Sequence, residues 1–180
     1  ILLLTVFTSI IFTLIDFQFK ITIANNFNTD IAMVSFFGQF YMITSLLSLF
    51  IQVFLAGRMI NRFGIIAGLN LLPILFIALP FLGLYSSALA LISIMKGAEQ
   101  IIKPTIFGSS LEIIWFPINV IKKNLYKPII NGSIKLLVQA LTGLFIFIIT
   151  IFNWELQIII STLLIVLAIS WVFISIKMKF

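Results

Sequence analysis

Six long apolar runs, separated by short polar turns, make up almost the whole chain. The runs cover residues 1–19, 31–56, 65–84, 88–114, 129–152 and 156–176. Each is close to the about 20 residues that a helix needs to cross the hydrocarbon core of a bilayer. The pattern therefore predicts an all-α polytopic membrane protein, with residues 1–180 forming one domain of six transmembrane helices. Because the chain opens at Ile1 inside an apolar run, we expect it to be a segment of a longer protein.

Polar residues inside the runs are not scattered but recur at helical spacing. On four of the six runs they fall within an arc of about 80° or less around the helix, so each of these helices carries one polar stripe. The stripes consist of Thr5, Ser9, Thr13, Asp16 and Lys20 on the first run; Tyr41, Ser45, Ser48 and Gln52 on the second; Lys96, Glu99, Lys103 and Ser110 on the fourth; and Asn131, Lys135, Gln139 and Thr142 on the fifth. The third and sixth runs carry no comparable stripe. We expect the four striped helices to surround a polar cleft and the other two to lie outside it.

Charged residues on these stripes indicate what the cleft does. A charge near the centre of a bilayer costs roughly 2.5–3.5 kcal/mol on insertion scales, so Lys96, Glu99 and Lys103 are not expected to face lipid. They either line a transport pathway or form an internally paired structural helix. Spacing of four residues pairs Asp16 with Lys20 and Glu99 with Lys103, although Glu99 could instead pair with Lys96 at a spacing of three.

Those two pairs leave Lys96 and Lys135 without an acid at that spacing, so we expect both to be free. A cleft with spare ammonium groups favours an anionic substrate, because each group offers three donors to a phosphate or carboxylate. The candidate substrate-binding residues are Lys20, Lys96, Lys103, Lys135, Asp16, Glu99 and Gln139.

Composition narrows the possible functions further. The chain is 62% hydrophobic and only 9% charged, against roughly 25% charged in soluble domains. It has no Cys and no His, and its five acids form no metal-ligand motif. We therefore expect no enzymatic activity, no cofactor and no metal site, and we expect the lipid bilayer as the first partner.

The net charge of +6 indicates how the chain is oriented in the membrane rather than nucleic-acid binding. The loop Lys and Arg residues lie in three places that fall on the same side of an alternating six-span topology, and the positive-inside rule makes that side cytoplasmic. Both ends of the segment are then expected in the cytoplasm. The residues concerned are Arg58, Arg62, Lys122, Lys123, Lys127, Lys177 and Lys179.

The basic turn from Gly57 to Gly64 resembles the loop between the second and third helices of a major facilitator superfamily half. The family pattern is roughly Gly-x-x-x-Asp-Arg-x-Gly followed by basic residues. Gly57, Arg62 and Gly64 match it, whereas Asn61 stands where Asp is usual and two isoleucines replace the basic pair. The resemblance implies a 3+3 bundle of six helices, a second six-helix half, and a role in gating for Gly57, Asn61, Arg62 and Gly64.

A narrower resemblance covers most of the chain. Residues 16–20, Asp-Phe-Gln-Phe-Lys, are similar to the Asp-Tyr-Gln-Phe-Lys signature of bacterial proteins related to ATP/ADP translocases, in which it opens the second half. Residues 36–41, 62–64 and 110–117 are also similar to that group. The resemblance implies a bacterial inner membrane, nucleotide exchange or uptake, and a partner half that is upstream in the same chain or supplied by a dimer.

Three functions follow as alternatives. The first is half of a secondary transporter that moves an organic or phosphate-bearing anion, possibly a nucleotide, by alternating access. The second is a membrane scaffold or assembly protein whose stripes only hold helices together. The third is an oligomeric pore.

Overall fold

The computed structural model describes residues 1–82, 88–151 and 156–177, and within these ranges it is all-helical, with no strand. In chain order the elements are α1 (Leu2–Asn26), α2 (Asp30–Phe54), α3 (Ala56–Leu82), α4 (Ala88–Ile102), the π-helix η2 (Lys103–Phe107), α5 (Gly108–Ile114), α6 (Val120–Pro128), the π-helix η3 (Ile129–Ile134), α7 (Lys135–Ile151) and α8 (Leu156–Lys177). The prediction of an all-α chain is confirmed.

Five helices in the described residues are long and apolar enough to cross a membrane. They are Leu2–Asn26, Asp30–Phe54, Ala56–Leu79, Val120–Ile151 and Ile159–Lys177. The remaining predicted span, residues 88–114, is helical throughout as α4, η2 and α5. It carries four charged side chains along its length, those of Lys96, Glu99, Lys103 and Glu112.

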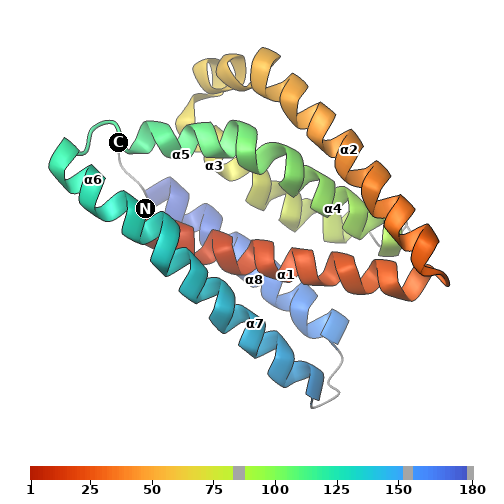
Figure 1. The fold of residues 1–180 in the computed structure, drawn as a ribbon. Helices are drawn as coiled ribbons and strands as arrows, with labels where there is room; N and C mark the ends of the chain where they lie inside the picture. The colour runs from red at the N-terminus through yellow and green to blue at the C-terminus, as the bar shows by residue number, and fades with distance from the viewer. Residues whose placement is uncertain (83–87, 152–155, 178–180) are drawn as a thin grey trace.

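The helices form a central pair with one helix on either side and two behind (Figure 1). The central pair consists of α1 and the run from α4 to α5, which pack on each other. On one side, α2 lies against α4 and η2; on the other, α7 lies against α1. Behind them, α8 packs on both α1 and α3. The start of α1 and the end of α8 lie on the same side of the bundle as α6.

The core forms around α1, the most deeply buried of the five long helices. Its residues Ile11, Leu14, Ile15 and Phe19 are fully buried. Trp171 of α8 is also fully buried and packs edge-on against Phe12 of α1 and Phe107 of η2, with ring centroids 5.9 and 5.3 Å away. These contacts fix α1 against α4 and α8, so the residues on the outward face of α1 have a rigid support.

The expected loop from Gly57 to Gly64 is mostly helical, which corrects the sequence analysis. The helix α3 already begins at Ala56, with a single residue between it and the end of α2, and is interrupted at Gly64. Gly64 has φ 81° and ψ 170°, a conformation that other residues rarely adopt. Arg58 and Arg62 therefore lie on a short helical segment, and both are exposed.

The predicted fifth span, residues 129–152, also begins earlier than expected. The helix α6 continues through η3 into α7, so one helix extends from Val120 to Ile151. Pro128 lies inside this helix. Proline removes one backbone donor and crowds the preceding turn, and the wider π-helix that follows accommodates this defect. A second π-helix, η2, contains Pro104 in the same way.

The close contact between α3 and α5 gives the first testable prediction. A Cβ atom added at Gly68 would overlap the hydroxyl oxygen of Ser110, which is fully buried, and would lie 3.3 Å from Cγ2 of Ile106. Gly68→Ala should therefore lower the free energy of unfolding by about 1–3 kcal/mol. Thermal unfolding of the purified protein in detergent measures this.

Gly143→Ala on α7 is the matched control, because nothing lies within 4 Å of the added methyl group. That substitution should be neutral or stabilise the protein by up to about 1 kcal/mol. Equal stability of the two variants would contradict the close packing of α3 on α5.

Candidate functional site

Five charged side chains form a continuous chain of ion pairs across the central helices. Lys20 lies 2.6 Å from Asp16, and Lys96 lies 2.8 Å from the other oxygen of Asp16. Lys96 is also 2.7 Å from Glu99, whose second oxygen is 2.8 Å from Lys103. Positive and negative groups thus alternate along the chain, which we call the ion-pair chain.

Helical spacing within α1 and α4 produces most of these contacts. Asp16 and Lys20 are one turn apart on α1, and Glu99 lies within one turn of both Lys96 and Lys103 on α4. The contact between Lys96 and Asp16 joins the two helices. Because α1 and α4 pack directly on each other, the two polar stripes merge into one charged strip.

The expectation that Lys96 is free is wrong. Its ammonium group is held by two carboxylates from two helices, and its side chain is only 6% exposed. Glu99 is 3% exposed, whereas Asp16 and Lys103 are each 35% exposed and Lys20 is 60% exposed. The buried centre of the ion-pair chain is therefore fully paired. Three ammonium groups face two carboxylates, so one positive charge remains uncompensated toward the exposed ends.

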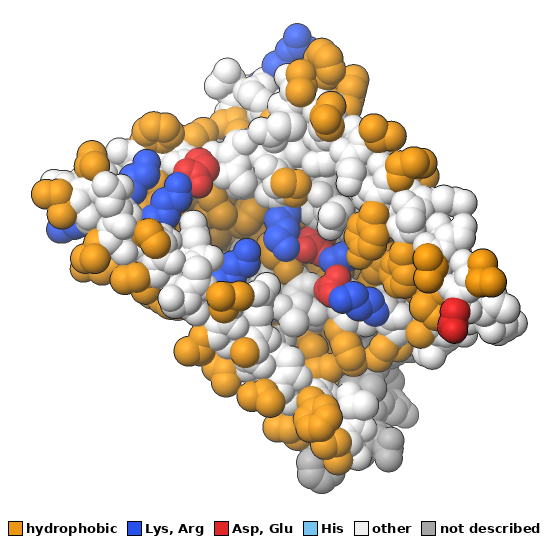
Figure 2. Space-filling view, in the orientation of Figure 1, with side chains coloured by type: hydrophobic (Ala, Val, Ile, Leu, Met, Phe, Trp, Pro, Cys, Tyr) orange, Lys and Arg blue, Asp and Glu red, His pale blue; other side chains and the backbone are white. Residues whose placement is uncertain are grey.

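A polar cavity of about 320 Å³ opens onto this strip. Side chains from α1, α4, η2 and α7 line it: Phe12, Thr13, Asp16, Lys96, Glu99, Gln100, Lys103 and Gln139. Figure 2 shows the charged side chains gathered in a hollow at the middle of this face, within a rim of hydrophobic side chains. We call this hollow the charged cavity.

Two of the candidate residues lie beside the charged cavity rather than in its lining. Lys20 reaches the strip only through Asp16. Lys135 is half-buried on α7, one turn before Gln139, and makes no ion pair with any described residue. Its position next to a lining residue leaves it as an available cation at the edge of the charged cavity.

Two residues that the sequence analysis did not select complete the lining. The ring of Phe12 lies under Lys103, with the ammonium nitrogen 4.1 Å from the ring centroid. This is the geometry of a cation–π contact, and it holds Lys103 over the aromatic cluster of the core. Gln100 follows Glu99 directly. The sequence could have indicated both residues, because Phe12 lies one helical turn before Asp16 and Gln100 directly follows Glu99.

The four residues of the expected gating loop lie elsewhere. None of Gly57, Asn61, Arg62 and Gly64 lines the charged cavity or belongs to the ion-pair chain. Arg62 instead lies 5.6 Å from the ring centroid of its neighbour Phe63. In the described residues, therefore, these four side chains are separate from the charged site.

Among the described residues, no three His, Cys, Asp or Glu side chains are grouped so that they could hold a metal. Comparison with protein-family models, with curated proteins and with solved structures found no match for the chain. The geometry of the charged cavity is therefore the basis for the function proposed for this protein.

Proposed function

We propose that this chain is one six-helix half of a secondary transporter that moves an organic or phosphate-bearing anion by alternating access. The observation that carries the proposal is the ion-pair chain, with its surplus positive charge, at the floor of a polar cavity among apolar helices. In this proposal the helical run from Ala88 to Ile114 is a sixth span. Lys96 then lies about 12 Å along it from Ala88, well inside the bilayer.

The partial exposure of the charged side chains suggests that another protein segment covers this face. Charged groups at this depth need a protein interior or a watery cavity, yet Lys103 and Asp16 are each about one-third exposed on an open face. A second six-helix half, from the same chain or from a dimer partner, would cover this face. The binding site would then lie between two halves, as in transporters built from repeats.

The charge balance argues for an anion. An approaching phosphate or carboxylate would meet Lys103, Lys20 and Lys135 first, because the carboxylates already hold Lys96 in the interior. Charge-assisted hydrogen bonds from ammonium groups to such oxygens are short and strong. A nucleotide is one member of this substrate class. The positive-inside rule supports cytoplasmic ends, and the bacterial inner membrane belongs to the same proposal.

Transport by the full-length parent protein in liposomes tests the proposal. Saturable uptake of labelled phosphate esters, with counterflow when the same ester is loaded inside, is the expected result. Electrical conductance that does not saturate would instead identify an oligomeric pore. Folded protein with no flux would favour the scaffold, for which the full pairing of Lys96 and Glu99 already provides a structural reason.

Lys135 provides a prediction specific to transport. Because this lysine has no acidic partner among the described residues, Lys135→Gln strands no carboxylate and should leave the unfolding temperature unchanged. If Lys135 donates to the anion, the KM for uptake should rise about 10- to 100-fold, the range expected for losing one hydrogen bond to a charged group. Lys177→Gln, at the end of α8, is the control and should leave KM unchanged. An unaltered KM together with reduced stability would assign Lys135 a structural role.

A further inference from the structure

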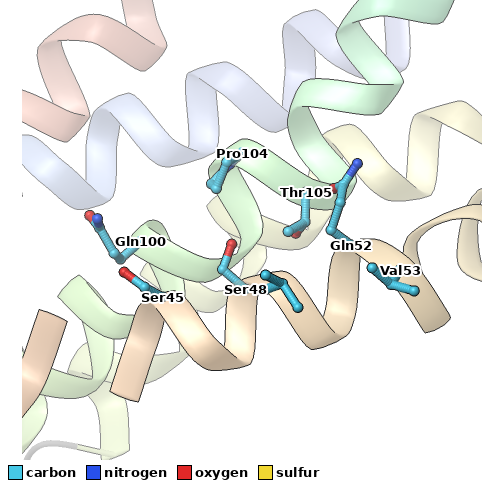
Figure 3. Close-up of a pocket in the computed structure, with 8 residues that line it drawn as sticks. Ser45, Ser48, Gln52, Val53, Gln100, Pro104 and Thr105 are labelled. Atoms are coloured by element: carbon cyan, nitrogen blue, oxygen red, sulfur yellow. The ribbon is translucent and has the colours of Figure 1, made fainter. Parts of the chain in front are cut away.

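A second cavity, of about 380 Å³ and with a mostly apolar lining that includes several neutral polar groups, lies between α2 and the helix that carries the charged residues (Figure 3). Its polar lining comes from Ser45, Ser48 and Gln52 on α2, from Gln100 on α4 and from Thr105 in η2. None of its lining residues is charged. In Figure 3, Ser48 and Gln52 project from α2 toward η2, and Gln100 stands on α4 at one end.

Ser48 and Gln52 differ from most polar groups in the helices, whereas Thr105 in the same lining of this neutral cavity donates to the carbonyl oxygen of Ile101. Most buried hydroxyls, such as those of Thr44, Ser110 and Thr142, donate to a carbonyl oxygen one turn earlier in their own helix. Ser48 and Gln52 make no hydrogen bond within the described part of the chain. Ser48 is half-buried and Gln52 is exposed, so both side chains are accessible to a ligand. At membrane depth a polar group without a partner is costly, and a polar ligand would remove that cost.

The neutral cavity adjoins the charged cavity. Gln100 lines both, and Lys103 of the charged cavity directly precedes Pro104 of the neutral one. Pro104 also lacks the N–H that would bond the carbonyl oxygen of Gln100 in a regular α-helix. A single ligand can therefore extend from the ammonium groups past Gln100 to the hydroxyl and amide groups of α2.

We infer that the neutral cavity is a subsite for the uncharged, hydroxyl-bearing body of the transported anion. This inference rests on the proposed function and adds a substrate class: phosphate esters of polyols or sugars rather than inorganic anions. Ser hydroxyls and Gln amides both donate and accept hydrogen bonds, which matches the hydroxyl groups of such a body. Selectivity would then reside on α2, while the charged cavity supplies affinity for the phosphate.

The test compares two ligands that share the phosphate and differ in the body. Binding of methyl phosphate and of a hexose phosphate is titrated by thermal stabilisation of the full-length protein in nanodiscs. Gln52→Met should weaken hexose phosphate binding about three- to tenfold, as expected for one lost neutral hydrogen bond, and leave methyl phosphate within about twofold. Ser48→Ala removes a smaller polar group and should also weaken hexose phosphate binding more than methyl phosphate binding. Gln39→Met, the same substitution elsewhere on α2, is the control.

The outcomes separate the two proposals. If neither phosphate binds the parent protein, the anion site and the subsite both fail. If both bind, but Gln52→Met and Ser48→Ala leave the ratio of their affinities unchanged, only the subsite fails. A loss of stability without ligand, with equal weakening of both ligands, would show that α2 contacts a second helical body here, and this also overturns the subsite.

Discussion

Replacing Glu99 by glutamine is expected to destabilise the protein by about 3–5 kcal/mol, the cost of breaking a buried ion pair by removing one partner. Glu99 is 3% exposed and bonds two lysines, at 2.7 and 2.8 Å. Without it, three ammonium groups face the single carboxylate of Asp16 in the ion-pair chain. Lys96 cannot move its charge to water, because its side chain is only 6% exposed.

Thermal unfolding of the purified full-length protein in detergent measures this effect, and the chain offers a matched control. Glu112 pairs with Lys127 at 2.5 Å but is 56% exposed. Glu112→Gln removes the same chemical group at a site where an ion pair is worth up to about 1 kcal/mol. Equal changes for the two variants would show that the ion-pair chain is hydrated and contributes little to stability.

A double variant checks the cause of the destabilisation. Adding Lys96→Met to Glu99→Gln removes the buried ammonium group that the first change strands, while Asp16 keeps Lys20 at 2.6 Å. The double variant should therefore be more stable than Glu99→Gln alone. Further loss of stability in the double variant would assign the effect of Glu99 to packing rather than to charge.

Residues that share a helix face could be grouped from the sequence. The helical angle places Asp16 on one face of α1 and Gln139 on one face of α7, and the cost of a charge in lipid turns such faces toward protein or water. The structure brings Asp16, Lys96, Glu99, Lys103 and Gln139 to one cavity. Helical periodicity and the cost of burying charge were sufficient for this part.

Contacts between helices could not be derived in the same way. Spacing of three or four residues finds partners within one helix, but Lys96 also pairs with Asp16, which lies 80 positions earlier on a different helix. The prediction of a free Lys96 failed because Glu99 binds both lysines and Asp16 adds a second carboxylate to Lys96. The stripe of Ser45, Ser48 and Gln52 was expected, but its separation from the charged cavity was not, because it depends on how α2 packs on η2.

The effects of Pro128 and Gly64 on the helix boundaries did not follow from the apolar pattern of the sequence. The predicted fifth span begins at residue 129, just after Pro128, yet the structure has one continuous helix that includes Pro128 and the π-helix after it. At Gly64 the helix is broken by a positive φ angle, which the apolar pattern around it does not reveal. Both outcomes depend on local backbone geometry rather than on hydrophobic periodicity.

Replacing Lys103 by glutamine should have the opposite profile to Glu99→Gln, with a large loss of anion binding and little loss of stability. Lys103 is 35% exposed, bonds only Glu99 among the acids and lines the charged cavity. Without it, two lysines balance two carboxylates, and Glu99 keeps Lys96 at 2.7 Å. The free energy of unfolding should therefore change by no more than about 1 kcal/mol.

Binding should respond far more strongly, because the surplus positive charge of the cavity disappears with Lys103. A hydrogen bond to a charged group contributes about 1.5–3 kcal/mol, so the Kd for methyl phosphate should rise about 10- to 100-fold. Titration of the full-length protein in nanodiscs measures this, with the exposed Lys122→Gln on α6 as control. If Lys103→Gln binds methyl phosphate as the parent does, or if Lys122→Gln loses as much affinity, the charged cavity is not the anion site. If affinity falls for Lys103→Gln alone while its unfolding temperature holds, the exposed end of the ion-pair chain is where the anion binds.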